Sequence, residues 1–234
     1  MKHAYNVLYY LILSISAAFM LLLIAYIDYS DTNTIHNYSQ EIVVGFFILS
    51  CILGISLAIR PRWYKKIIKR KDNNKIIKQT QKIRRKRKGH HPDCNQFKNH
   101  VVKIKNKSFC SGCLGLALGS AISIILIILY YTLTLQQRST TFYLFIYLGL
   151  IIICFSYIEI MILKRNVIVH IISNILLVVS FFLITISVFE LTKNLVIGMI
   201  SILLSYLWLT TRVQISISRH ILICNNCSKT CKMY

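Results

Sequence analysis

Residues 110–135 read CSGCLGLALGSAISIILIILYYTLTL. A Cys-x-x-Cys pair runs directly into an apolar stretch that is long enough to cross a hydrocarbon core of about 30 Å. Thiols at this spacing are typical metal ligands, and the stretch after them predicts a membrane-spanning helix. These residues therefore predict a helical membrane protein with a metal-binding motif at the bilayer surface.

The composition extends this prediction to the whole chain. Its 234 residues are 56% apolar and 15% charged, with a mean hydropathy of +0.59. A soluble domain carries about 25% charged residues, and its apolar residues are not gathered in long blocks. We expect an all-α integral membrane protein, a six-helix transmembrane bundle with spans at 5–27, 42–59, 114–135, 142–163, 167–189 and 195–211. The first run exceeds the roughly 7–15 apolar residues of a signal peptide, so we interpret it as a span.

The basic residues predict the orientation. Nineteen of the 28 Lys and Arg residues lie between Arg60 and Lys107. With the N-terminus in the cytoplasm, only Arg138 and Lys193 fall outside. Because basic residues are enriched in cytoplasmic loops, we expect a multi-pass cell-membrane protein with both termini cytoplasmic.

The chain divides into five predicted parts: a transmembrane hairpin (1–59), a basic linker (60–89), a Cys/His knuckle (90–113), a four-span bundle (114–211) and a Cys-rich tail (212–234). In the basic linker, paired apolar residues recur among the charges, as in an amphipathic helix on a membrane surface. Residues 60–88 either fix the topology alone or bind anionic lipid headgroups. Nucleic-acid binding is disfavoured because stacking platforms and a recognisable fold are absent.

The knuckle has the spacing of a zinc ribbon in which one Cys is replaced by His. With His91 as a ligand, the pattern is H-x2-C-x15-C-x2-C. Its cysteines are Cys94, Cys110 and Cys113. Residues 101–110 predict a short hairpin that presents the second pair. The sequence leaves open which histidine coordinates. The candidate ligands are His90, His91, Cys94, His100, Cys110 and Cys113.

A second Cys/His cluster follows the last predicted span. It is formed by His220, Cys224, Cys227 and Cys231. It could supply four ligands alone or lend some to the knuckle, because both clusters are predicted on one membrane face. Cytoplasmic thiols are normally reduced, so metal binding is favoured over disulfides. We expect structural zinc; an iron–sulfur cluster and a set of inert thiols are the alternatives.

Three polar residues lie inside predicted spans near the cytoplasmic side: Glu159, His170 and Asn174. An ionisable residue at membrane depth is a candidate functional site, although pairing near the interface also explains it. This intramembrane polar site favours a transporter or a lipid-modifying enzyme as one alternative function. A membrane redox protein with an iron–sulfur or thiol centre is the other.

The Cys/His motifs resemble a family of uncharacterised prokaryotic, mainly archaeal, multi-pass membrane proteins with a His-His-Pro-x-Cys segment, a later Cys-x-Gly-Cys-x-Gly and a Cys-rich tail. The matching positions are His90, His91, Pro92, Cys94, His100, Cys110, Gly112, Cys113, Gly115, Gly119, Cys224, Cys227 and Cys231. The resemblance implies the architecture and a metal site, but no activity.

The sequence assigns no reaction. It contains no nucleotide-binding loop, no Ser-His-Asp arrangement and no paired acidic metal motif, and its seven acidic residues leave little scope for acid–base chemistry. We therefore expect a structural or interaction role for the metal site.

Overall fold

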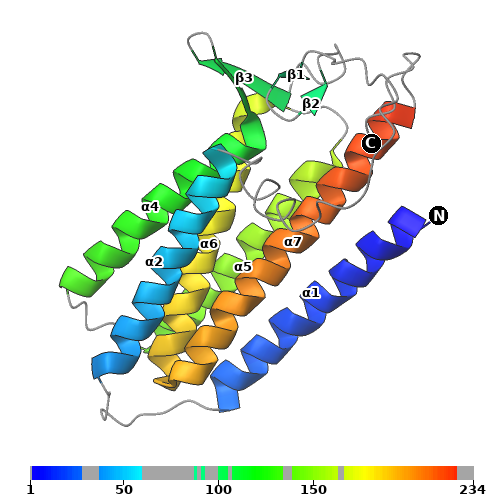
Figure 1. The fold of residues 1–234 in the computed structure, drawn as a ribbon. Coiled ribbons are helices and arrows are strands. Elements are labelled where there is room, and N and C mark those ends of the chain that lie inside the picture. Colours follow the sequence, from blue (N-terminus) through cyan, green and yellow to red (C-terminus); the bar gives the residue numbers. More distant parts are fainter. Residues whose placement is uncertain are drawn as a thin grey trace, which may run out of the picture.

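Six long helices run side by side in the protein (Figure 1). The computed structural model describes residues 2–27, 37–59, 87–88, 91–92, 100–104, 107–133, 139–162 and 166–225. The helices are α1 (Lys2–Ile27), α2 (Asn37–Ile59), α4 (Ser111–Leu133), α5 (Ser139–Met161), α6 (Val167–Thr192) and α7 (Leu195–Asn225). Each predicted span overlaps one of them.

All six helices are long and apolar enough to cross a membrane. At a rise of about 1.5 Å per residue, the shortest of them, with 23 residues, spans the roughly 30 Å of a hydrocarbon core. Large apolar side chains such as Ile15, Leu144 and Leu203 point outward and are more than 60% exposed. An outer surface of this kind suits contact with lipid. The length and apolar character of its six helices make the chain a multi-pass membrane protein.

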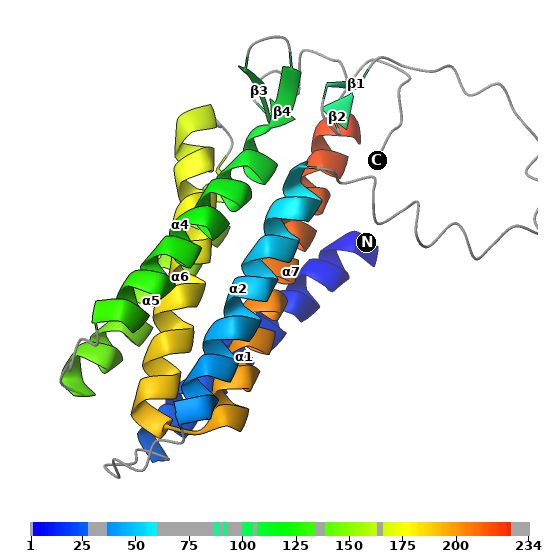
Figure 2. The ribbon, with the colours of Figure 1, turned by 60° about the vertical axis from the view of Figure 1, so that its left-hand side comes forward.

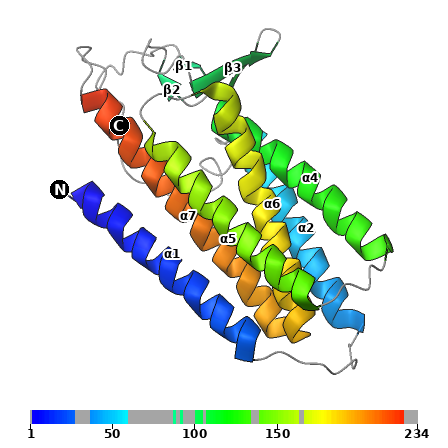
Figure 3. The ribbon, with the colours of Figure 1, turned by 180° about the vertical axis from the view of Figure 1, so that it is seen from behind.

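Helix α6 forms the centre of the bundle. It packs most extensively against α4 and α5, and also contacts α7 and α1. Helix α2 pairs with α4 on one side, and α1 lies along α7 on the other (Figures 1 and 2). The first turn of α1, the last turn of α7 and the strands lie at one end of the bundle (Figure 3). We call this the strand end.

Two glycines allow α4 to approach α6 closely. A Cβ at Gly115 would lie 2.6 Å from Asn174 Cβ and 2.7 Å from the Ile171 carbonyl oxygen. A Cβ at Gly119 would lie 2.9 Å from Ile175 Cα. Small residues four apart permit such backbone contacts between membrane helices, where close packing drives association.

Polar side chains attach α1 to the bundle. Ser14 Oγ lies 2.7 Å from Thr211 Oγ1 on α7, and Trp208 Nε1 donates to the Ser14 carbonyl oxygen at 3.2 Å. Tyr157 on α5 donates to the Trp208 carbonyl oxygen at 3.0 Å. Hydrogen bonds of this kind stabilise helix pairs where water is absent.

Two short antiparallel pairs precede α4. Strand β1 (Arg87–Lys88) pairs with β2 (His91–Pro92), and β3 (Val101–Ile104) pairs with β4 (Lys107–Cys110). In the second pair Val101 lies opposite Cys110, so the predicted hairpin is confirmed. Because α4 begins at Ser111, β4 delivers Cys110 directly to the start of that helix.

Helix α7 continues past the predicted end of the last span at residue 211. Its 31 residues reach Asn225, so the first half of the predicted tail is helical. Two facts explain the difference. Residues 212–225 contain no Pro or Gly that would end the helix. Arg212, at the predicted boundary between membrane and cytoplasm, is buried among polar partners inside the bundle. Near its end, Arg219 donates to the Met161 and Ile162 carbonyl oxygens and caps α5.

Candidate functional site

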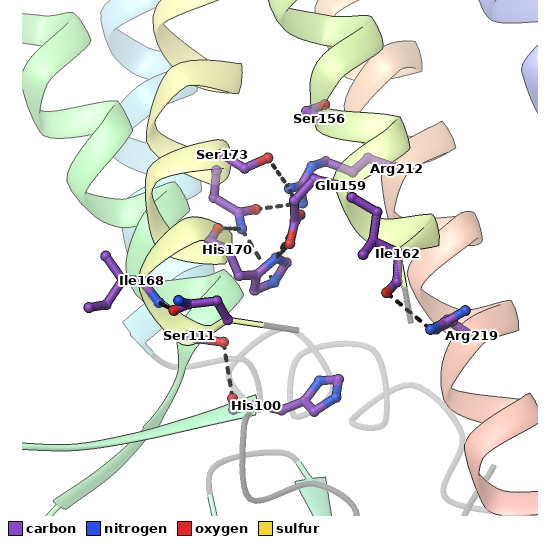
Figure 4. Close-up of polar contacts among 12 residues, drawn as sticks. His100, Ser111, Ser156, Glu159, Ile162, Ile168, His170, Ser173, Arg212 and Arg219 are labelled. Carbon is purple, nitrogen blue, oxygen red and sulfur yellow. Dashed lines mark hydrogen bonds and ion pairs between the residues drawn. The ribbon is translucent and has the colours of Figure 1, made fainter. Parts of the chain in front are cut away.

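Three ionisable side chains meet inside the strand end of the bundle (Figure 4). Glu159 comes from the last turn of α5, His170 from the first turn of α6, and Arg212 from α7. Each is 5% exposed. Helices that end or begin at the strand end therefore bring these residues together, Arg212 from 53 positions beyond Glu159.

Glu159 is bonded on two sides. Its Oε1 and Oε2 lie 3.1 and 2.9 Å from His170 Nδ1. Arg212 Nη2 donates to Oε2 at 3.3 Å. The carboxylate therefore has a cation on one side and an imidazole on the other.

Arg212 and Asn174 extend the network along α6. Arg212 Nη1 donates to Asn174 Oδ1 at 2.7 Å, and Arg212 Nη2 donates to Ser173 Oγ at 3.0 Å. Asn174 Nδ2 donates to the His170 carbonyl oxygen at 2.6 Å. We call these five residues the polar cluster: Glu159, His170, Ser173, Asn174 and Arg212.

The polar cluster is self-neutralising when His170 is neutral, because the Arg212 and Glu159 charges then cancel. Transferring either ion alone from water into the apolar bundle would cost several kcal/mol. Pairing and hydrogen bonding offset that cost, which explains how both remain buried in an apolar bundle.

The Cys-x-Gly-Cys motif lies directly against the polar cluster. A Cβ at Gly112 would be 3.1 Å from His170 Nε2, 3.8 Å from Cys110 Sγ and 3.9 Å from Asn174 Nδ2. The Cys110 and Cys113 thiols also interact with each other. The predicted thiol motif and the predicted intramembrane polar site are thus neighbours.

The two predicted Cys/His clusters also meet. The His100 ring, just before β3, lies with its centroid 5.2 Å from that of His220 on α7 in an edge-to-face arrangement. Both side chains are buried, at 5% and 6% exposure. Ser111 Oγ donates to the His100 carbonyl oxygen at 3.2 Å and ties the start of β3 to the start of α4.

Other predicted ligands lie outside the described residues: His90, Cys94, Cys227 and Cys231. His91 and Cys224 are described by their backbone alone, and most of 60–88 lies outside the described residues. Among the described side chains, no three His, Cys, Asp or Glu residues form a group that could hold a metal ion.

Two members of the polar cluster were not predicted from the sequence. They are Arg212 and Ser173. Arg212 reads as one more basic residue after the last span, in keeping with the positive-inside pattern. One signal was available: Arg212 is four residues after Trp208 and three before Ile215, so all three share one helix face, and this face is buried. Ser173 carries no signal beyond its place next to Asn174.

Comparison of the chain with protein-family models, curated proteins and solved structures finds no match. The family resemblance given above stays a prediction, and the site is interpreted from its own residues.

Proposed function

We propose that this membrane protein binds a structural metal ion, zinc by its ligand types, at the cytoplasmic face. The ion would join the knuckle to the tail and hold the strands on the end of the bundle. The observation that supports this proposal is the contact between His100 and His220, which brings together two Cys/His segments that lie 120 positions apart in the sequence. Two interacting thiols, Cys110 and Cys113, are present at the same end.

The residue chemistry fits zinc. Structural zinc sites are tetrahedral and use Cys and His ligands, and the two segments offer more ligands of these kinds than one closed site requires. A surplus of this kind suits a site shared between knuckle and tail, or two adjacent sites. Such ions contribute directly to folding, so the function we infer is the ordering of a cytoplasmic surface that a partner or lipid headgroups contact.

Metal analysis of anaerobically purified protein tests the proposal. We expect stoichiometric zinc in the native protein and loss of most of it when Cys110 and Cys113 are both changed to Ser. Cys154→Ser is the matched control, because Cys154 is an exposed residue of α5 that lies outside both clusters. A native protein without bound metal would contradict the proposal, and a broad visible absorbance band with bound iron would favour the iron–sulfur alternative.

A second candidate function, transport or lipid chemistry, is favoured by the convergence of Glu159, His170 and Asn174 in the polar cluster. Two features weigh against it. The charged groups of Glu159 and Arg212 are bonded to each other and to α6, and every member of the cluster is nearly inaccessible. This bonding suits a rigid support better than a site that must open to a substrate.

A further inference from the structure

His170 connects the polar cluster to the thiols through its two ring nitrogens. Nδ1 lies against both oxygens of Glu159. Nε2 lies on the opposite side of the ring, toward Gly112, and this nitrogen and Cys110 Sγ both lie within 4 Å of the point where a Gly112 Cβ would sit. The imidazole therefore stands between a buried carboxylate and the Cys-x-Gly-Cys motif.

The partners of the ring determine its tautomer. Glu159 is paired with Arg212, and an ionised carboxylate accepts hydrogen bonds but donates none. Nδ1 must then carry the proton. Arg212 fixes the Asn174 amide by donating to its oxygen, so the amide nitrogen faces the His170 carbonyl oxygen and, at 3.4 Å, Nε2. Nε2 is consequently unprotonated. Its lone pair accepts this long hydrogen bond from Asn174, and a metal ion at Nε2 would replace that bond.

This arrangement has the features of a metal-ligating histidine. Such a residue coordinates through one nitrogen and donates the other N–H to a carboxylate or carbonyl oxygen, which fixes the ring and raises its basicity. The absence of a side chain at Gly112 keeps the point within 4 Å of Nε2 and Cys110 Sγ unfilled, since a Cβ there would crowd His170 Nε2 at 3.1 Å.

We propose that His170 is a ligand of the metal ion, through Nε2, together with the thiolates of Cys110 and Cys113. Glu159 then orients the ring by accepting from Nδ1, and Arg212 and Asn174 hold Glu159 and the ring in place. The inference rests on the proposed metal binding. It concerns the knuckle side of the two adjacent sites and places that ion at the junction of loop and bundle.

Binding must draw the three donors together, since the described side chains do not form a three-ligand group. Zinc binds sulfur at about 2.3 Å and imidazole nitrogen at about 2.0–2.1 Å. Cys110 and Cys113 each have a single side-chain rotation before the sulfur, and their sulfurs already interact. The rigid partner is His170, which Glu159 and the α6 backbone fix in advance.

The test uses full-length protein in detergent, loaded with Zn²⁺ or Co²⁺. X-ray absorption spectroscopy of the zinc form counts the sulfur and nitrogen ligands of the ion. The visible absorption bands of the cobalt form report the same set of ligands. We expect His170→Ala to lose one nitrogen ligand and at least tenfold in affinity. Glu159→Gln should keep the ligand count and lose about 10–100-fold in affinity, as other outer-shell changes do.

His170→Cys keeps the proposal testable if the alanine variant does not fold. Cysteine can still coordinate, so we expect a bound ion whose shell has one more sulfur and one less nitrogen. Ser180→Ala is the control on α6, because the Ser180 side chain is buried and donates to the Leu177 carbonyl oxygen of its own helix.

The outcomes separate the two proposals. If the native protein binds the ion and the His170 variants keep an unchanged shell and affinity, the role of His170 is wrong and the metal-binding proposal stands. If the native protein binds neither Zn²⁺ nor Co²⁺, both proposals are wrong.

Discussion

Gly115 sets the distance between α4 and α6 at the level of single atoms. A Cβ there would meet Asn174 Cβ at 2.6 Å and a backbone oxygen of α6 at 2.7 Å, and backbone cannot move aside without separating the helices. We expect Gly115→Ala to destabilise the protein by about 1–3 kcal/mol, the usual range for overpacking. Thermal unfolding in detergent, followed by circular dichroism, measures the change.

Gly45→Ala is the matched control for this substitution. Gly45 lies within α2, and a Cβ there would have nothing within 4 Å. We expect no loss of stability and a gain of at most about 1 kcal/mol, the helix-propensity advantage of Ala over Gly. Equal melting temperatures for the two variants would contradict the close-packing role of Gly115.

Arg212 supports a second prediction at the residue scale. Arg212→Met removes the cation and leaves Glu159 buried beside His170, and we expect a loss of about 3–5 kcal/mol, the range for breaking a buried ion pair from one side. Glu159→Gln in the same chain removes the uncompensated charge and should recover part of the loss. A double-mutant cycle measures the coupling; additive effects would show that the two side chains do not interact in the membrane.

The residues of the polar cluster show how far sequence reasoning reaches. An ionisable group inside an apolar run is conspicuous, so Glu159 and His170 could be identified as a candidate pair. Arg212 could not, because a basic residue after an apolar run is also what the positive-inside rule predicts. The contact of Gly112 with His170 was beyond reach, since it depends on how α4 and α6 cross.

Helix α7 shows the same limit at the scale of elements. Six helices follow from apolar length, and their starts are close to those predicted. The end of α7 differs because a buried Arg212 and a capping Arg219 keep residues 212–225 helical, and both interactions are made with other helices. Tertiary partners that lie far away in the sequence thus decide where this element stops.

Trp208 joins α7 to α1, and its loss should weaken that pair. The side chain is 1% exposed, stacks on Phe181 and donates to the Ser14 carbonyl oxygen. Trp208→Ala leaves a cavity between helices, and we expect a cost of roughly 3–5 kcal/mol, as for other buried aromatic truncations. Chemical or thermal unfolding in detergent measures the loss.

Leu203→Ala is the control on the same helix, because Leu203 is 64% exposed on the outer surface. We expect this variant to unfold close to the native protein. A crosslink between engineered cysteines in α1 and α7 should also form less efficiently after Trp208→Ala. An unchanged crosslinking yield would place the stabilising effect of Trp208 elsewhere in the bundle.

The whole molecule combines an apolar bundle with a charge distribution that is strongly one-sided. Six crossings return the chain to the end at which it started, so the start of α1, the end of α7 and the strands share the strand end (Figures 1 and 3). In the sequence, nineteen of the 28 basic residues lie between the end of α2 and the start of α4, whose nearer ends are both at the strand end, whereas the connection between α6 and α7 at the other end carries Lys193 alone. Lys193 ends α6 in the left-handed region with φ of 49° and pairs with Glu190, which cancels that charge.

This asymmetry predicts that the strand end faces the cytoplasm, because basic segments are retained there. A fluorescent reporter fused after Tyr234 should therefore be active. A phosphatase reporter that requires the external side should be active when inserted at Asn194 and inactive after Tyr234. The reversed pattern would put the Cys/His segments in an oxidising compartment, where disulfides replace metal thiolates, and would contradict the orientation and the metal proposal together.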